Sequence, residues 1–238
     1  MKVCLLLSGQ LRNAVEIFPY FEKNLLSLYD VDVFISSWRN TSQIDSSNNF
    51  NVVPYDDSLS EVLRLYNPAS IELESYDYNY NNIWVDMVNP FKSKMETNTN
   101  LVSMCSMFYK MMKSNEVKNN FKKINNIHYD LVIQTRMDIK LEEELKLSLP
   151  NANTLYIPKG WDWSGGLNNL LAYGDEDTMN QYCNLFNHYT NILTDMDLIN
   201  SEKVTKQYIK TKTNLTIDRP AVDLTLRNMN IKETYWFN

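Results

Sequence analysis

The chain has 238 residues, of which 44% are hydrophobic and 22% are charged, and its formal net charge is -6. This length and composition favour one folded domain spanning 1–238 and exclude a chain that is disordered throughout. A net negative chain lacks the Lys and Arg excess that non-specific binding to nucleic acid requires, so nucleic acid is not an expected partner.

The first residues of the chain predict the opening of an α/β sheet. The apolar run 3–7 stops at Ser8-Gly9 and predicts a strand that is buried on both faces. Apolar residues at helical spacing over 17–28 predict a helix, and the β-branched segment 31–37 predicts a second strand. This order implies a parallel pair with a right-handed crossover. We therefore expect a Rossmann-type, mainly parallel central sheet flanked by helices.

The middle of the chain alternates between polar segments and apolar stripes. Segments 40–58 and 75–100 are rich in Asn, Ser, Asp or Tyr and are predicted to be loops or lids. Between them, 59–66 predicts a helix and 71–73 a short strand. A Met-rich stripe over 101–124 predicts one or two helices, whose methionines are expected to pack in the core rather than form a binding surface.

The rest of the chain predicts further strands, at 130–135, 154–158 and 170–173. Asp175 is a plausible N-cap for a helix that carries Phe186. Pro220 suits the first turn of a short helix that runs through Leu226, and alternation over 231–237 predicts a last strand.

The three cysteines and the apolar run near the N-terminus indicate where in the cell the protein is expected. Cys4, Cys105 and Cys183 lie far apart in apolar segments without a CxxC pair, so they are expected to be buried free thiols. The run 3–7 is too short for a secretory signal and far too short to span a bilayer. We expect a cytoplasmic protein without a transmembrane segment.

The candidate ligand site lies after the predicted strands, because open α/β sheets bind ligands beyond the carboxyl ends of their strands. After the first strand, Gly9 lets the backbone approach a ligand and Arg12 offers donors suited to phosphate; the alternative is a solvated turn with a surface arginine. After the second strand, Trp38 would either stack on a base or cap the core.

Two charges stand at the end of the buried strand 130–135. Arg136 and Asp138 need partners there, because an unpaired buried charge is costly. One interpretation is a mutual or loop-mediated ion pair. The other is a carboxylate for Mg²⁺ or Mn²⁺ beside a guanidinium for a diphosphate.

Segment 160–169 holds three of the five glycines and two of the five tryptophans. Tryptophan faces pack against the apolar faces of sugars, and Asn amides hydrogen-bond hydroxyl groups. The segment therefore indicates a carbohydrate-binding loop, and a hydrophobic plug between loops is the competing interpretation.

In this order and spacing, these motifs resemble small GT-A-type glycosyltransferases, which are found in bacterial surface-polysaccharide clusters and in large DNA viruses. The resemblance covers roughly residues 1–190. It rests on Ser8-Gly9-Gln10-Leu11-Arg12, the strand 33–37 ending in Trp38, Thr135-Arg136-Met137-Asp138, and Gly165-Gly166-Leu167-Asn168-Asn169 followed by Ala172-Tyr173-Gly174 and Met179.

The resemblance implies a GT-A-like fold and sugar transfer from a nucleoside-diphosphate sugar, such as a UDP- or GDP-sugar, to a glycan or other hydroxyl acceptor. It places the protein in the cytoplasm, or in the host cytoplasm if the chain is viral. The implied donor-binding residues are Ser8, Gly9, Gln10, Arg12, Ser36, Trp38, Arg136 and Asp138. The implied acceptor- or sugar-binding residues are Trp161, Trp163, Gly165, Gly166, Asn168 and Asn169.

Two positions depart from the pattern of this family. Asp138 stands for the last acidic residue of the Asp-x-Asp motif and would ligate Mn²⁺ or Mg²⁺, but Arg136 replaces the first Asp and could itself neutralise a diphosphate. Asn169 stands where related sequences tend to carry Asp, and an amide cannot take a proton. Asp162, a carboxylate flanked by two tryptophans, is therefore predicted to be the catalytic base.

Two other functions remain open. Arg136 and Asn169 make a catalytically inactive nucleotide-sugar or carbohydrate-binding protein credible. A nucleotidyltransferase would share the nucleotide-binding sheet but would be expected to carry a Gly-rich, Lys-bearing loop after the first strand, where this chain has none.

Overall fold

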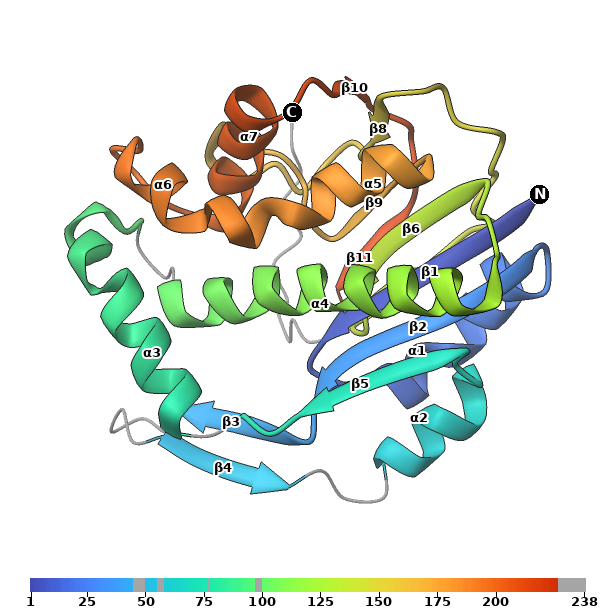
Figure 1. Cartoon of the computed structure of the whole chain (residues 1–238), viewed down its shortest axis with the longest axis horizontal. Helices are drawn as coiled ribbons and strands as arrows, with labels where there is room; N and C mark the ends of the chain where they lie inside the picture. The colour runs from blue at the N-terminus through green and yellow to red at the C-terminus, as the bar shows by residue number, and fades with distance from the viewer. Residues whose placement is uncertain (45–49, 55–57, 77, 97–99, 227–238) are drawn as a thin grey trace.

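A seven-stranded sheet forms the centre of the protein (Figure 1). The computed structural model describes residues 1–44, 50–54, 58–76, 78–96 and 100–226. Neighbouring strands are parallel except at β9, which runs antiparallel to β6 and β8. In spatial order the strands are β10 (Thr216–Asp218), β8 (Thr154–Tyr156), β9 (Leu171–Gly174), β6 (Leu131–Arg136), β1 (Lys2–Gly9), β2 (Asp30–Trp38) and β5 (Ser70–Glu74). The predicted mainly parallel, Rossmann-like sheet is confirmed.

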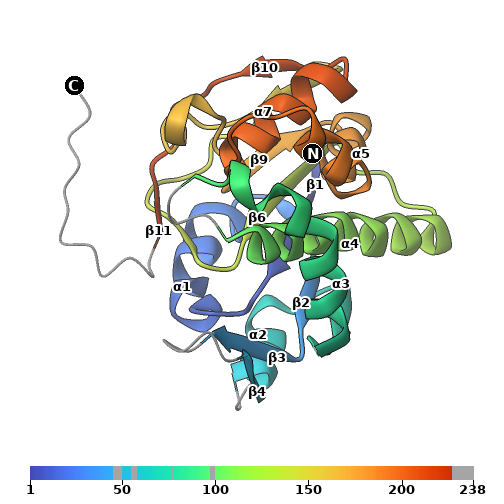
Figure 2. The same ribbon diagram turned by 90° about the vertical axis from the view of Figure 1, so that its left-hand side faces the viewer.

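Helices cover both faces of this sheet, as predicted. The α4 helix lies across the face turned toward the viewer in Figure 1, and α1 and α2 lie behind it; Figure 2 shows the same arrangement from the side. The helices are α1 (Ala14–Phe21), α2 (Ser58–Tyr66), α3 (Tyr78–Val88), α4 (Leu101–Asn125), α5 (Glu176–Cys183), α6 (Tyr189–Thr194) and α7 (Ser201–Lys212). Shorter helical turns are η1 (Glu22–Leu26), η2 (Asn89–Lys94), η3 (Trp163–Gly165) and η4 (Asn184–His188).

The central strand β1 shows why its sequence is a continuous apolar run. Leu5 and Leu7 pack on the face covered by α1 and α2, whereas Cys4 and Leu6 pack on the face covered by α4. All four side chains are fully buried, and burying each leucine contributes about 1.5–3 kcal/mol. A strand buried on both faces has no position at which a polar side chain would be favourable.

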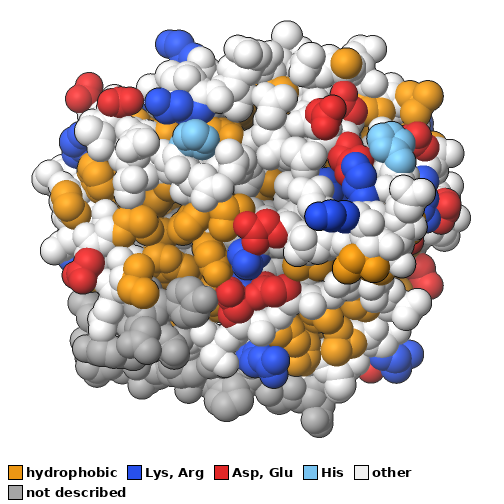
Figure 3. Space-filling model, viewed as in Figure 1, with side chains coloured by type: hydrophobic (Ala, Val, Ile, Leu, Met, Phe, Trp, Pro, Cys, Tyr) orange, Lys and Arg blue, Asp and Glu red, His pale blue; other side chains and the backbone are white. Residues whose placement is uncertain are grey.

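The prediction for the cysteines is confirmed, and the prediction for the methionines of α4 is confirmed in part, because Met104 and Met107 also line a cavity at the edge of the sheet. Cys4, Cys105 and Cys183 are buried free thiols. Met104 and Met111 of α4 are buried in the core on that face of the sheet. Apolar side chains gather on the surface seen in Figure 3. Partly buried residues such as Met87 pack against this core. Within the described residues, no helix is long and apolar enough to cross a membrane.

Two segments predicted as loops contain regular structure, and those predictions are wrong. Within 40–58, β3 (Asn40–Ile44) and β4 (Phe50–Pro54) form an antiparallel pair. Within 75–100, α3 and η2 are helical. Trp84 and Val88 of α3 are buried one turn apart, so packing of this pair outweighs the Asn- and Tyr-rich composition of the segment.

The prediction of a short helix from Pro220 through Leu226 is also wrong. Residues 220–223 have no regular secondary structure, and β11 (Leu224–Leu226) pairs antiparallel with β7 (Ile139–Leu141). Val222, Leu224 and Leu226 alternate with polar residues and pack against the core, which is the period of a strand. The last strand predicted over 231–237 lies outside the described residues.

Candidate functional site

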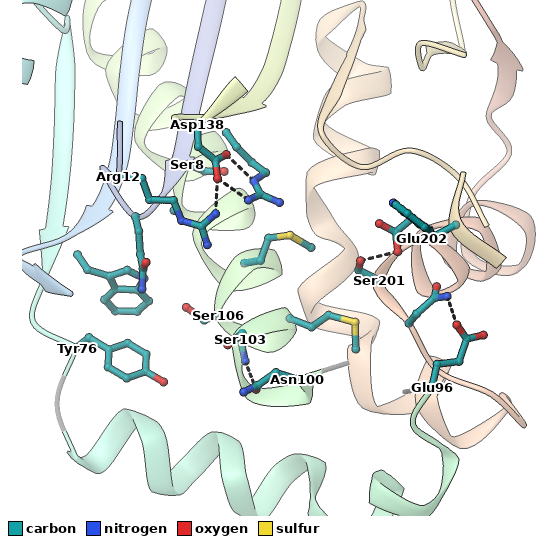
Figure 4. Close-up of a pocket in the computed structure, with 18 of the residues that line it drawn as sticks. Ser8, Arg12, Tyr76, Glu96, Asn100, Ser103, Ser106, Asp138, Ser201 and Glu202 are labelled. Atoms are coloured by element: carbon teal, nitrogen blue, oxygen red, sulfur yellow. Dashed lines mark hydrogen bonds and ion pairs between the residues drawn. The ribbon is translucent and has the colours of Figure 1, made fainter. Parts of the chain in front are cut away.

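A cavity of about 700 Å³ opens at the carboxyl ends of β1, β2 and β6 (Figure 4). The chain passes from β1 to β2 on one side and returns through β6 on the other, and such a switch point is where open α/β sheets bind ligands. The cavity brings together these predicted residues: Ser8, Gly9, Gln10, Arg12, Trp38, Arg136, Asp138 and Trp163. Its volume is in the range of small-molecule sites, about 300–1,000 Å³.

The most strongly charged feature of this cavity is an ion triad of two arginines and one aspartate. Asp138 is 1% exposed and accepts hydrogen bonds from Arg136 Nε at 2.9 Å and Arg136 Nη2 at 2.7 Å. Arg12 Nη1 donates to the same carboxylate from the turn after β1. Side chains of Arg12 and Arg136 remain 38% and 21% exposed. The triad therefore presents a net charge of +1 to the cavity.

These contacts fix the charge of Asp138. Burial by itself raises the pKa of this carboxyl group, but Arg136 and Arg12 outweigh burial and hold the pKa below its usual value. The carboxylate stays ionised near neutral pH and orients both guanidinium groups. The sequence left open an ion pair and a diphosphate site. The ion pair is observed and holds both arginines at the cavity, whereas the diphosphate site stays a prediction.

The backbone around the triad is shaped by the turn after β1. Gly9 has a φ of 103°, which lies in the region that only glycine adopts readily, and Arg12 has a φ of 42°. Gly9 lies beside Ser37 of β2, and Ser8 lies opposite Arg136 of β6. The turn thus carries Arg12 back toward the end of β6.

Trp38 lines the cavity but is only 1% exposed. Lys110 Nζ lies 4.0 Å from the centre of its ring, and Tyr109 lies nearly parallel to the ring with centroids 6.0 Å apart. Because its faces are in use, Trp38 forms a wall of the cavity, and this geometry favours the core-capping interpretation. Ser36 does not line the cavity; its hydroxyl donates to Glu72 Oε2 at 2.6 Å.

The Trp- and Gly-rich loop divides into a part that lines the cavity and parts that do not. Trp163 lines it and is 44% exposed. Trp161 is partly buried and packs against the core on the face of the sheet that α1 and α2 cover. Asn168 is fully buried and holds the loop, since its Oδ1 accepts from the Leu170 N–H at 2.8 Å. Asn169 is 6% exposed, and its Nδ2 has no hydrogen-bond partner among the described residues.

Asp162, the predicted catalytic base, lies outside the cavity lining. Its carboxylate pairs with Arg219 at 2.7 Å and accepts from the Asn168 N–H at 2.8 Å. Arg219 also donates to the backbone oxygens of Ile157 and Pro158, at 2.9 and 2.8 Å. This geometry makes Asp162 a group that fastens the loop to the segment after β10.

Gly165 and Gly166 shape the same loop without lining the cavity. A Cβ at Gly166 would lie 2.5 Å from the backbone nitrogen of Lys203, so the loop backbone rests directly on the first turn of α7. The Leu167 N–H donates to the Glu202 backbone oxygen at 2.9 Å. Gly165 has a φ of 76°, and its carbonyl accepts from Lys206 Nζ at 2.8 Å.

Several residues of the cavity were missed by sequence reasoning, among them Tyr76, Glu96, Asn100, Ser103, Ser106, Ser201 and Glu202. Figure 4 shows Ser201 and Glu202 across the cavity from Arg12 and Asp138. Glu202 lies in the first turn of α7, and Asn200, which accepts from the Lys203 N–H at 2.8 Å, caps that helix. An Asn-Ser-Glu cap before the apolar residues of α7 was the signal available in the sequence.

The resemblance implies a divalent cation at Asp138, and the donor set there does not fit one. Both carboxylate oxygens already accept from guanidinium groups. A cation at this carboxylate would meet the positive charge of both arginines at short range. In the part of the chain that the structure describes, no group of three or more His, Cys, Asp or Glu side chains is placed to hold a metal ion.

Comparison of the chain with models of known protein families found no match, and a search of curated proteins also found none. Its function must therefore be inferred from the cavity and the residues around it.

Proposed function

We propose that this protein transfers a sugar from a nucleoside-diphosphate sugar to a hydroxyl acceptor. The observation that carries the proposal is the pair of guanidinium groups that Asp138 holds at the switch point of the sheet. Arginine donors arranged in a fixed fork match the geometry of phosphate oxygens. The cavity is large enough to hold a sugar beside a diphosphate.

The charge arrangement suits a diphosphate leaving group. When the bond between the anomeric carbon and the diphosphate breaks, negative charge grows on the β-phosphate oxygens. Positively charged donors that are already oriented stabilise that charge without reorganising. Arg12 and Arg136 meet this condition because Asp138 fixes both, and this role needs no divalent cation at Asp138.

The remaining walls suit the sugar and its acceptor. Ser8, Ser103 and Ser106 place hydroxyl groups along the cavity, and such groups both donate and accept hydrogen bonds. Trp163 presents an exposed ring at the same cavity, which suits the apolar face of a sugar. We assign Trp163 rather than Trp161 to the acceptor or the transferred sugar.

A panel of UDP-, GDP-, CMP- and dTDP-sugars tests the proposal in two steps. A ligand at 100 times its dissociation constant should stabilise the fold by about 2.7 kcal/mol, which a melting curve resolves. Release of the free nucleotide then separates a transferase from the alternative of an inactive binding protein, which would be stabilised without releasing nucleotide. Absence of stabilisation by every nucleotide sugar, with and without Mn²⁺, would contradict the proposal.

A further inference from the structure

The carboxylates around the cavity differ in what they contact. Among the described residues that line it, Asp138 is held by two arginines, and Glu96 is held by Lys203 together with Ser164 and Asn200. Glu202 forms no ion pair within the described part of the chain. Its Oε2 accepts a hydrogen bond from Ser201 Oγ at 2.8 Å.

The position of Glu202 is fixed by its backbone rather than by a cation. It lies in the first turn of α7, where Gly166 packs on the helix backbone and the Leu167 N–H binds its carbonyl oxygen. Figure 4 shows it on the far side of the cavity from Arg12 and Asp138. A sugar whose diphosphate lies at the arginines would therefore have Glu202 on its other side.

From this placement we infer that Glu202 is the general base that deprotonates the acceptor hydroxyl. This inference rests on the proposed transferase function. The acceptor O–H proton passes to the Glu202 carboxylate while the acceptor oxygen bonds to the anomeric carbon. The bond from that carbon to the diphosphate breaks, and its electron pair leaves with the nucleoside diphosphate at Arg12 and Arg136. The proton on Glu202 then passes to solvent.

The electrostatic surroundings of Glu202 suit this task. Burial raises the pKa of its carboxyl group, and Glu96 raises it further. Ser201, the backbone N–H of Glu202 itself and Arg136 lower the pKa without cancelling the effect of burial. Lys203, the nearby cation on α7, is paired with Glu96 instead. Bases work best when their pKa lies near the working pH, so a raised value favours proton transfer.

Other ionisable side chains at the cavity fit the role less well. Asp138 and Glu96 have lowered pKa values and are committed to ion pairs. Tyr76 has a pKa raised to about 12 by burial, so it stays protonated near neutral pH.

The test compares the wild type with Glu202→Gln, which keeps the shape of the side chain and removes its basicity. The probes are UDP-glucose, UDP-N-acetylglucosamine, GDP-mannose and dTDP-glucose, with release of nucleoside diphosphate as the readout. Glu116→Gln, an exposed carboxylate of α4, is the matched control and should behave as the wild type. Melting temperatures and affinities for UDP and GDP are measured for all three proteins.

We expect Glu202→Gln to keep its nucleotide affinity within about threefold and to lose roughly 10²- to 10⁴-fold in turnover. The wild-type rate should rise with pH through the raised pKa of Glu202, and this limb should be missing in the variant. Turnover within fivefold of the wild type in a folded Glu202→Gln protein would overturn the base assignment and leave the transferase proposal standing. Failure of the wild type to bind or release any of these nucleotides would overturn both.

A second measurement is independent of activity. Carbon NMR of protein labelled at its glutamate carboxyl carbons identifies Glu202 by the resonance missing in Glu202→Gln. We expect that resonance to titrate at higher pH than the carboxyl group of a glutamate in an unstructured peptide. Titration at or below the pH of the peptide glutamate would overturn the assignment.

Discussion

The stability contribution of the ion triad can be worked out from its burial. Asp138→Asn removes the charge that two guanidinium groups share, although the new amide oxygen still accepts one hydrogen bond. Removing one partner of a fully buried pair costs roughly 3–5 kcal/mol. Arg12 is 38% exposed and Arg136 is 21% exposed, so water partly solvates the cations left behind. We therefore expect a smaller loss in the free energy of unfolding, of about 2–3 kcal/mol.

Urea unfolding followed by circular dichroism measures this loss, and a thermal melt should show a drop of roughly 4–12 °C for a chain of this size. Asp30→Asn is the matched control, because Asp30 is 72% exposed in its pair with Lys2, and it should change stability by less than about 0.5 kcal/mol. A loss for Asp138→Asn as small as that of the control would refute the reasoning.

The lowered pKa of Asp138 also predicts the direction in which the stability effect of Asp138→Asn changes with pH. Folding lowers the pKa of Asp138, so its contribution is fully present above the unfolded value of about 3.9 and is lost as the pH falls through the lower folded value. The difference in stability between wild type and Asp138→Asn should therefore be constant near neutral pH and shrink below about pH 4. A difference that grows on acidification would contradict the sign.

Three further outcomes follow from contacts around the cavity. Arg136→Lys should weaken binding of UDP or GDP about tenfold in titration calorimetry, because an ammonium cannot make a bidentate contact, and EDTA should leave the wild-type affinity unchanged. Gly166→Ala should lower the free energy of unfolding by about 1–3 kcal/mol and reduce turnover, since its Cβ collides with the backbone of α7; unchanged melting would count against that contact. Lys110→Met should cost about 2–3 kcal/mol in urea unfolding, because two carboxylates that are 22% and 23% exposed lose their shared buried cation. Neutralising both carboxylates in that background should restore part of the loss.

The sheet could be predicted because its strands carry local signals. The run 3–7 and the segment 130–135 are apolar enough to require burial on both faces. The pair β3–β4 was hidden by its Asn- and Ser-rich surroundings. In α3, the signal that mattered was a single pair, Trp84 and Val88, inside a polar segment. The average composition of a long segment does not reveal a single apolar pair of this kind.

The site was predictable to the extent that its residues follow strands. Arg136 and Asp138 were found because charges at the end of a buried strand need partners. The partner of Asp162 could not be found in this way, because Arg219 lies 57 residues further along the chain. Glu202 was missed for a related reason: it lies at the start of a helix, and only the packing of α7 on Gly166 brings it to the cavity.

One wall of the cavity is closed by contacts between segments that are distant in the chain. Asn200 Nδ2 donates a hydrogen bond to Glu96 Oε2 at 2.7 Å, and the Ile199 N–H donates to the Lys94 carbonyl oxygen at 2.8 Å. Asn200, which begins this wall, lies 104 residues after Glu96 in the chain. A growing polypeptide on the ribosome therefore carries β1, Arg12 and Asp138 before this wall exists. The cavity becomes complete only when α7 has been synthesised and has docked, so an unfinished chain lacks one wall of the cavity.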